Sequence, residues 1–442
     1  MRHSRATTPR KDFVERQTRD VTKRGHHVRR ARFRGSGYFR RLGPGIITGA
    51  ADDDPSGIAT YSQVGAATGF SLLWTAVVAL PLATAVQEAT ARLGLVTDKG
   101  LAALIKTHFS RRILLFSVAL VTLANTFNIG ADIGSMAAAT RLLVPIPNVV
   151  LVIGFTALMA GLEVFVPYHR YSKVLRWFCL SIIAYILVLF YLEVSWRDVL
   201  TSALSPSLEF SRTQIAAVIA IFGTTISPYL FFWQAAEEVE EINQTGTGSR
   251  PTRLDINAMR GDVVAGMSSG VTVMFAIMVT AAATIGSRGS VRISTAEQAA
   301  EALRPLAGDM AGLLFTAGIV GTGLLAVPVL AGSTAYAVSE AFGWREGLSN
   351  KLSQAKAFYF VIVASMFGGL LMNLLGLDAV RALYLSAILN GLTAPPLIIL
   401  VWLLARSKDV LGEHRSGKIS QTGLITAAII SSGLPILLIF AR

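Results

Sequence analysis

Three consecutive aspartates interrupt the first long apolar stretch of the sequence. Residues 45–51 are mostly apolar and run into Asp52, Asp53 and Asp54, which Pro55 follows directly. A carboxylate near the middle of a bilayer costs about 2.5–3.5 kcal/mol on insertion scales. Because proline cannot continue a regular helix from the preceding turn, the segment is expected to be both charged and unwound there. Such a segment in a membrane usually lines a pathway or holds an ion.

A second interruption lies five apolar segments later. The stretch 213–240 contains Pro228 near its middle, shortly after the hydroxyl-bearing Thr224, Thr225 and Ser227. Proline removes one backbone hydrogen bond from a helix, and neighbouring hydroxyl groups can satisfy the freed backbone groups. Two broken spans separated by an odd repeat length are typical of inverted-repeat transporters, which bind substrate between the breaks. The two breaks therefore predict one shared ion site.

Composition and segment lengths place these breaks in an integral membrane protein. Hydrophobic residues make up 52% of the 442 positions and charged residues 15%, whereas soluble domains carry about 25% charged residues. We predict an all-α membrane protein with two inverted five-helix repeats, over about 42–193 and 213–405, plus an extra helix over about 419–440. Each predicted span is long enough to cross a bilayer core of about 30 Å. The eleven spans are 42–66, 70–94, 112–141, 148–167, 173–193, 213–240, 259–285, 308–340, 356–376, 379–405 and 419–440.

The positive charge of the chain is concentrated before the first span. Residues 1–41 hold 14 Lys and Arg and 3 Asp and Glu. They therefore contribute most of the chain's net charge of +13. This composition predicts a disordered tail that contacts membrane lipid, and we favour that over a nucleic-acid partner. The predicted inner loops and their flanks carry 18 Lys and Arg, and the outer ones carry 8. The N-terminus is therefore expected in the cytoplasm and the C-terminus outside a cell membrane. The predicted inner loops are 95–111, 168–172, 241–258, 341–355 and 406–418.

The candidate ligands at the paired breaks are oxygen atoms. Asp54 is the strongest candidate, unwound backbone carbonyls around Gly57 and Thr224 add neutral oxygens, and the hydroxyls of Thr225 and Ser227 can contribute directly or through water. Oxygen-only sites suit Mg²⁺, Ca²⁺ or Mn²⁺ better than softer metals. Small residues beside the break leave room for the water that Mg²⁺ retains. The expected substrate is a hard divalent cation, and no cofactor is expected.

Other acidic residues are weaker candidates for the pathway. Successive helical residues point about 100° apart, so Asp52 and Asp53 cannot join Asp54 around one ion from a regular helix. Each of them lines the aqueous approach, binds the ion directly or is a hydrogen-bonded structural acid. Glu237 and Glu238 end the sixth span, where they either collect cations at the exit or form a solvated helix face.

Glu88 and Asp132 are acids within predicted spans two and three. Each is expected either to belong to the pathway or to pair with the backbone or with polar neighbours such as Asn125 and Asn128.

At both breaks the sequence resembles the Nramp family of divalent metal transporters. The Gly-Pro-Gly at 43–45, Gln87 and the Ala-Arg-Leu-Gly at 91–94 also match that family, and the resemblance covers about residues 42–405. It implies a LeuT-type fold of ten core helices plus one or two more. It also implies import of Mn²⁺ and Fe²⁺ together with protons.

The resemblance is incomplete at the metal ligands. The family's first-helix motif is Asp-Pro-Gly-Asn, and residues 54–57 here read Asp-Pro-Ser-Gly. The aspartate ligand therefore carries over to Asp54, whereas the asparagine ligand falls on Gly57. The sixth-helix motif Ala-Thr-Val-Met-Pro-His-Asn reads Thr-Thr-Ile-Ser-Pro-Tyr-Leu at 224–230, which places the methionine ligand on Ser227.

Other family positions differ as well. The alanine that supplies a carbonyl falls on Thr224, the sixth-helix histidine on Tyr229 and a tenth-helix glutamine on Ala387. The acidic pair that moves protons in the family falls on Ala124 and Phe127. The usual route for protons is therefore not expected in this chain.

These departures resemble the Nramp-related magnesium transporter branch. Methionine sulfur favours transition metals over hard alkaline-earth ions, so its loss removes that preference. We expect uptake of Mg²⁺ by alternating access, with Mn²⁺ tolerated and without obligatory proton coupling. The alternatives are a proton-coupled Mn²⁺/Fe²⁺ transporter and, less favoured, a metal sensor that transports nothing. An enzyme is not expected.

Overall fold

The computed structural model describes residues 44–166, 183–245, 251–288, 293 and 295–441. The predicted tail 1–41, the predicted loop 168–172 and the first half of the predicted fifth span lie outside these residues. Within the described residues every regular element is helical. The α-helices are α2 (Pro44–Asp52), α3 (Pro55–Thr68), α4 (Trp74–Thr97), α5 (Leu101–His108), α6 (Arg111–Thr140), α7 (Asn148–Phe165), α9 (Ile183–Val188), α10 (Trp196–Leu204), α11 (Arg212–Thr225), α12 (Pro228–Thr245), α13 (Arg253–Thr284), α14 (Ala296–Ala300), α15 (Arg304–Ala307), α16 (Ala311–Phe342), α17 (Lys356–Leu374), α18 (Ala379–Arg406), α19 (Lys408–Leu411) and α20 (Lys418–Phe440).

Most of the predicted spans are long apolar helical stretches in the structure. Across the described residues, 8 such stretches are long and apolar enough to cross a membrane: Arg111–Thr140, Asn148–Phe165, Arg212–Asn243, Arg253–Thr284, Ala296–Phe342, Lys356–Leu374, Ala379–Arg406 and Lys418–Phe440. The interrupted pair α2–α3, the 24-residue α4 and the partly described fifth span correspond to the other three predictions. Buried Glu88 and Arg92 lower the hydropathy of α4 without shortening it.

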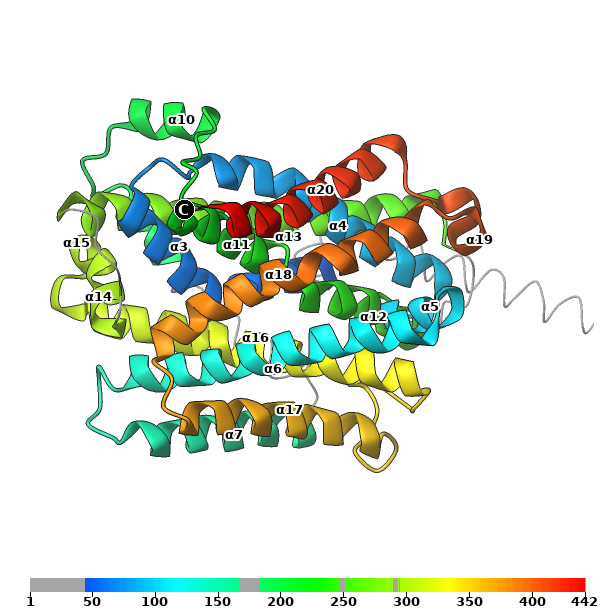
Figure 1. Cartoon of the computed structure of the whole chain (residues 1–442). Coiled ribbons are helices and arrows are strands. Elements are labelled where there is room, and N and C mark those ends of the chain that lie inside the picture. Colours follow the sequence, from blue (N-terminus) through cyan, green and yellow to red (C-terminus); the bar gives the residue numbers. More distant parts are fainter. Residues whose placement is uncertain (1–43, 167–182, 246–250, 289–292, 294, 442) are drawn as a thin grey trace, which may run out of the picture.

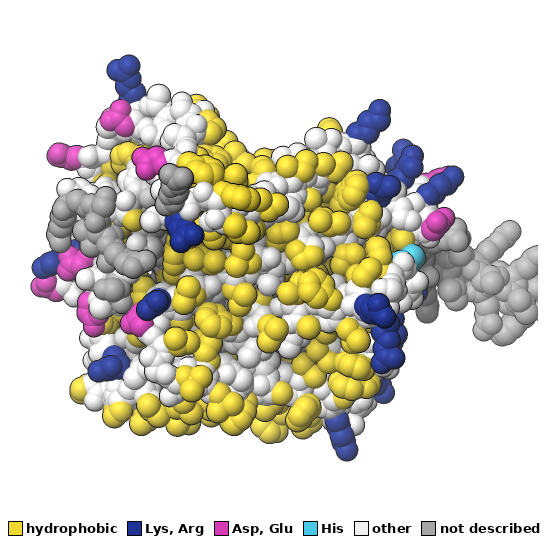
Figure 2. Space-filling view, in the orientation of Figure 1, with side chains coloured by type: hydrophobic (Ala, Val, Ile, Leu, Met, Phe, Trp, Pro, Cys, Tyr) yellow, Lys and Arg dark blue, Asp and Glu magenta, His cyan; other side chains and the backbone are white. Residues whose placement is uncertain are grey.

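The long helices lie side by side, as Figure 1 shows. Helices α7 and α17 form an outer layer against α6, and α20 lies on the opposite side against α18 and α4 (Figure 1). In Figure 2 an apolar belt separates two charged ends, with Lys and Arg prominent at the end that holds α5 and α19. The predicted orientation relies on this same charge asymmetry, and it stays a prediction.

The predicted inner loop 95–111 contains a helix that the span pattern did not predict. Helix α5 is only 8 residues long, so a search for membrane-length apolar runs passes over it. Its Leu101 and Ile105 are fully buried. Glu340 of α16 accepts a hydrogen bond from the Ala103 amide at 2.8 Å, which satisfies a donor in the first turn of α5.

Both predicted helix interruptions are present. Helix α2 ends at Asp52 and α3 begins at Pro55, whose fixed φ suits the first turn of a helix. Helix α11 ends at Thr225 and α12 begins at Pro228. The first and sixth spans are therefore each built from two half-helices, as an inverted-repeat transporter requires.

Helix α2 is held in place by unusually close packing on α13. A Cβ atom added at Gly49 would lie 2.3 Å from the Gly266 carbonyl oxygen, so only glycine allows the observed approach of the two backbones. The Gly45 amide also donates to the Asp262 carboxylate of α13 at 2.6 Å. Gly45 and Gly49 are four residues apart, which is the small-residue spacing that lets membrane helices touch.

Substitution of Gly49 by valine is expected to lower the thermal stability of the purified protein. The added side chain must push α2 away from α13, and such overpacking costs about 1–3 kcal/mol. Thermal unfolding in detergent measures the effect. Gly154→Val in α7 is the matched control, because nothing lies within 4 Å of a Cβ added there. Equal unfolding temperatures for the two variants would contradict this packing.

Candidate cation site

Asp54 is fixed at the start of α3. Its side chain is 1% exposed, and its Oδ1 accepts hydrogen bonds from the Ser56 hydroxyl at 2.6 Å and the Gly57 amide at 2.8 Å. Asp54 is thus the N-cap of this half-helix. The positive end of the helix dipole favours a negative charge at this position. The same contacts hold the carboxylate in one orientation, next to the gap between α2 and α3.

The second break lies directly opposite Asp54. The Ser56 hydroxyl lies 3.4 Å from the Thr224 hydroxyl at the end of α11. A Cβ added at Gly57 would lie 3.4 Å from both Thr224 Oγ1 and the Asp52 carbonyl oxygen. A side chain at Gly57 would therefore contact both broken spans. The structure brings Asp54, Gly57 and Thr224 together, as the sequence predicted.

Thr225 and Ser227 make their hydrogen bonds within the broken span, to α3 and to α13. The Thr225 hydroxyl donates to the Ile221 carbonyl at 2.8 Å and lies 3.0 Å from the Tyr61 hydroxyl. The Ser227 hydroxyl points back to the carbonyls of Gly223 and Thr224, at 2.8 and 2.6 Å. In this conformation the Ser227 hydroxyl caps the end of α11, and the Thr224 carbonyl oxygen is engaged as its hydrogen-bond acceptor. Rotation of the Ser227 hydroxyl would release that carbonyl for a cation.

A thioether also lies beside these ligand candidates. Met274 Sδ of α13 is 3.7 Å from Thr225 Oγ1. The sequence pattern did not identify Met274, because α13 carries no break and Met274 is 49 residues from Thr225 along the chain. The groups around the second break are therefore not exclusively oxygen atoms, which differs from the prediction.

Asp52 and Asp53 face a different element from Asp54. A Cβ added at Gly270 of α13 would lie 3.4 Å from Asp52 Oδ2 and 3.8 Å from Asp53 Oδ1. The Oδ1 atom of each is buried without a hydrogen-bond partner. Among the described residues, no group of three or more His, Cys, Asp and Glu side chains is placed to hold a metal ion. A cation beside Asp54 would therefore need hydroxyl, carbonyl or water ligands.

Tyr229 connects the two broken spans on the other side of the gap. Its hydroxyl donates to the Ala51 carbonyl near the end of α2 at 2.8 Å, and its own carbonyl accepts from the Ser333 hydroxyl of α16 at 2.7 Å. Tyr229 therefore joins the first turn of α12 to the end of α2. The resemblance in the sequence places a histidine of the similar family at this position, and Tyr229 supplies no imidazole.

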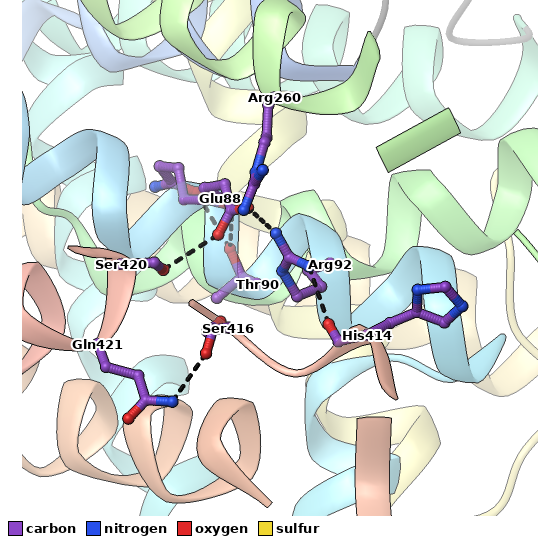
Figure 3. Close-up of polar contacts among 9 residues, drawn as sticks. Glu88, Thr90, Arg92, Arg260, His414, Ser416, Ser420 and Gln421 are labelled. Atoms are coloured by element: carbon purple, nitrogen blue, oxygen red, sulfur yellow. Dashed lines mark hydrogen bonds and ion pairs between the residues drawn. The ribbon is translucent and has the colours of Figure 1, made fainter. Parts of the chain in front are cut away.

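Glu88 belongs to an ion-pair network away from the breaks, drawn in Figure 3. It pairs with Arg92 on its own helix and with Arg260 Nε of α13 at 2.7 Å, and it accepts from the Ser420 hydroxyl of α20 at 3.2 Å. Arg92 also donates to the His414 carbonyl at 2.8 Å. Two guanidinium groups compensate this carboxylate, and the network ties α20 to α4 and α13. We therefore leave Glu88 out of the proposed pathway.

Glu237 and Glu238 lie on α12, near the end of the sixth span. Glu238 is buried, so the interpretation as a solvated helix face is wrong for this residue, whereas Glu237 is half-buried. Gln234 donates to Glu238 at 3.2 Å and accepts from the Thr48 hydroxyl of α2 at 2.5 Å. This chain of contacts joins α12 to α2 a second time, beyond Tyr229.

The end of α12 is also attached to the segment between α16 and α17. Glu240 accepts from the Leu348 amide at 2.6 Å and from the Tyr336 hydroxyl. Burial, followed by the charges of Glu340 and Glu240, raises the pKa of Glu346 in that segment to about 9. Glu346 is therefore protonated at neutral pH, and this end of the molecule carries less negative charge than its acidic residues suggest.

A family model and relatives that are similar in sequence point to one family. The family model described as natural resistance-associated macrophage protein-like (Nramp) matches residues 45–441. The divalent metal cation transporter MntH of Aeromonas hydrophila is 28% identical over 399 residues, covering 88% of this chain and 93% of the relative. MntH of Klebsiella pneumoniae is 26% identical over 400 residues, with 88% and 92% covered.

Solved structures show the same fold. A crystal structure of an Eremococcus coleocola manganese transporter mutant superposes with a TM-score of 0.72 at 18% identity, covering 91% of this chain and 87% of that one. Mhp1 in its inward-facing conformation gives a TM-score of 0.54 at 15% identity, with 90% of each chain covered. The predicted LeuT-type fold, with broken first and sixth spans, is confirmed by this similarity.

Proposed function

Because the chain belongs to the Nramp family, we propose that it transports divalent metal cations across the cell membrane by alternating access. The central observation is that two half-helix ends meet at a buried carboxylate, with 3.4 Å between Ser56 Oγ and Thr224 Oγ1. The MntH relatives carry the name of divalent metal cation transporters, which supports this cargo. The relatives are transporters rather than enzymes, and we assign no catalytic reaction.

In the proposed cycle a cation enters between the two helix breaks and exchanges part of its water for Asp54 and the neighbouring oxygens. Release of the cation on the other side of the membrane requires α2 and α12 to separate. The hydrogen bonds from Tyr229 to Ala51 and from Thr48 to Gln234 would have to break for that movement. The ion gradient and the membrane potential supply the driving force, about 2.3 kcal/mol per charge for each 100 mV.

Mn²⁺ is the cargo that the relatives' names support best. The Eremococcus coleocola protein is called a manganese transporter. In this chain a carboxylate and hydroxyl oxygens suit Mn²⁺, and the Met274 thioether beside Thr225 adds a softer group nearby. We therefore propose Mn²⁺ as the first cargo of the site.

Mg²⁺ is the second candidate cargo, and two positions favour it. Gly57 and Ser227 stand where the resemblance to the family would place asparagine and methionine ligands. Loss of an asparagine side chain at Gly57 favours a cation that keeps several water molecules, as Mg²⁺ does. We propose that the site accepts Mg²⁺ as well as Mn²⁺.

Proton movement is not required in the proposed mechanism. The resemblance to the family places its acidic pair at Ala124 and Phe127 of α6, and neither side chain can carry a proton. Uptake by wild-type protein is therefore expected to continue when a protonophore collapses the pH gradient at a clamped membrane potential. Loss of uptake under that condition would support a proton-coupled transporter.

Uptake by the full chain in proteoliposomes tests the proposed function. Mn²⁺, Mg²⁺ and Ca²⁺ are supplied separately and in competition, with protein-free vesicles as the blank. Saturable Mn²⁺ uptake, inhibited by Mg²⁺, is expected. Absence of flux for all three ions, with metal binding retained, would identify a sensor. Mn²⁺ uptake that excess Mg²⁺ leaves unchanged would remove Mg²⁺ from the proposal.

A further inference from the structure

Helix α2 runs alongside α13, and the contacts between them advance together along both helices. The Gly45 amide donates to the Asp262 carboxylate of α13. One turn later on each helix, a Cβ added at Gly49 would meet the Gly266 carbonyl oxygen. Gly270 lies one further turn along α13, on the same face as Gly266. The face of α13 at Gly270 therefore adjoins the end of α2.

Three oxygen atoms of α2 and the residue after it converge on Gly270. A Cβ added at Gly270 would lie 3.4 Å from Asp52 Oδ2, 3.4 Å from the Gly49 carbonyl oxygen and 3.8 Å from Asp53 Oδ1. Any larger residue in place of Gly270 would therefore put a carbon atom among the three oxygens. Carboxylate and carbonyl oxygens are the ligands that Mg²⁺, Ca²⁺ and Mn²⁺ take in proteins.

The two carboxylates lack compensating partners. Asp52 is 2% exposed and Asp53 is 5% exposed, and the Oδ1 atom of each has no hydrogen-bond partner. Among the described residues, neither forms an ion pair with Lys or Arg, whereas buried Glu88 has two such partners. Burial of a charge is costly unless an opposite charge compensates it. Asp132 of α6 is likewise buried without a partner, but it is the only acid of its helix.

The end of α2 also favours a cation at this place. Gly49 belongs to the last turn of α2, where the final four carbonyl groups of a helix have no partner within it. The negative end of the helix dipole lies there. The Ala51 carbonyl in this turn accepts from the Tyr229 hydroxyl, whereas the Gly49 carbonyl lies against Gly270. The dipole and the two carboxylates therefore attract a cation together.

This position differs from the one at Asp54. The Asp54 carboxylate accepts from the Gly57 amide at the start of α3, whereas the carboxylates of Asp52 and Asp53 face α13. Asp52 adjoins both positions. Its carbonyl oxygen would lie 3.4 Å from a Cβ added at Gly57, and its carboxylate would lie at the same distance from one added at Gly270. The two positions are therefore neighbours that share Asp52.

We propose that Asp52, Asp53 and the Gly49 carbonyl form a second binding position for a hard divalent cation, against Gly270 of α13, with water completing the shell. Two carboxylates balance the charge of one divalent ion, so the loaded position carries no net ionic charge within the membrane. Binding at this position requires no transport and so goes beyond the proposed function. In a transporter it would hold an ion immediately beside the helix breaks.

Mn²⁺ binding by the purified full chain tests this position, in the Asp54→Asn variant so that the first position is removed. Mn²⁺ is the probe, and the EPR signal of free Mn²⁺ measures how much remains unbound. We expect Asp54→Asn to keep saturable Mn²⁺ binding. Adding Gly270→Ala should weaken that binding at least about tenfold, because the methyl group stands among the three oxygens. Gly261→Ala on the same helix is the matched control and should leave binding unchanged, since nothing lies within 4 Å of a Cβ added there.

Both alanine variants are expected to fold. Alanine favours a helix more than glycine does, and distances of 3.4–3.8 Å around a Cβ at Gly270 are ordinary van der Waals contacts. Their metal-free unfolding temperatures should therefore be no lower than that of Asp54→Asn alone. If Gly270→Ala unfolds nevertheless, Asp52→Asn together with Asp53→Asn provides the same test without added volume. That pair should also weaken Mn²⁺ binding at least about tenfold.

Two results would overturn the inference. If Asp54→Asn binds no Mn²⁺, the chain has no second position. If binding survives both Gly270→Ala and the paired asparagine substitutions, the remaining ion lies elsewhere. Absence of uptake by wild-type protein is a separate outcome: the proposed function then fails, whereas Mn²⁺ binding that depends on Gly270 still supports the second position.

Discussion

Substitution of Asp54 by asparagine is expected to reduce Mn²⁺ and Mg²⁺ uptake at least about 100-fold, which corresponds to about 2.7 kcal/mol of binding. Asparagine can still accept the hydrogen bonds that Ser56 and Gly57 donate, so the cap of α3 survives. The negative charge at the break is lost. Initial rates of uptake in proteoliposomes, normalised to the amount of reconstituted protein, measure the effect.

The control for this prediction is Asp98→Asn, which changes the same chemical group at an exposed position. Its uptake should equal that of wild type. If Asp54→Asn keeps more than about a third of wild-type uptake, the Asp54 carboxylate is not the main ligand, because that loss is below about 1 kcal/mol.

Substitution of Ser227 by methionine is expected to change selectivity. A thioether favours transition metals over hard alkaline-earth ions and cannot hold water as a hydroxyl does. The ratio of Mn²⁺ to Mg²⁺ uptake should therefore rise about tenfold or more, equivalent to about 1.4 kcal/mol. Uptake of both ions, measured side by side in competition, gives the ratio directly.

Ser227→Ala separates selectivity from helix capping. Alanine removes the hydrogen bonds to Gly223 and Thr224 without adding sulfur. Uptake of both ions should change together in that variant, and their ratio should stay close to wild type. An unchanged ratio in Ser227→Met would place the discriminating group elsewhere, and Met274 would be the next residue to vary.

The broken spans were predictable from the sequence because their causes are local. Pro55 and Pro228 interrupt helices wherever they occur within a membrane segment, and an aspartate before a proline fits the N-cap of the next half-helix. The odd repeat length of five spans then predicted the inverted repeat. Asp54 and Thr224 each lie at a break, and the symmetry of the two repeats brings the two breaks opposite each other.

Contacts between unbroken helices were not predictable in the same way. Met274 and Asp132 lie in regular helices, and their faces depend on how those helices pack. Glu88 illustrates the limit, since its partners Arg260 and Ser420 are 172 and 332 residues away in the sequence. Its acidity alone suggested a pathway, whereas packing brings one basic and one polar partner to it.

Helix α5 was missed for a related reason. Its 8 residues are too few for a membrane-length pattern. A backbone amide in its first turn finds its hydrogen-bond acceptor in Glu340, which belongs to a distant helix. A short helix whose stability comes from tertiary contacts leaves only a weak local signal.

Anomalous X-ray diffraction from crystals of the chain grown with Mn²⁺ tests the central claim most directly. The account predicts a dominant anomalous peak between the start of α3 and the end of α11, within bonding or one-water distance of the Asp54 carboxylate. The peak should be absent from crystals of Asp54→Asn. A dominant peak at Glu237 and Glu238, with none beside Asp54, would contradict the assignment of the transport site to the two helix breaks.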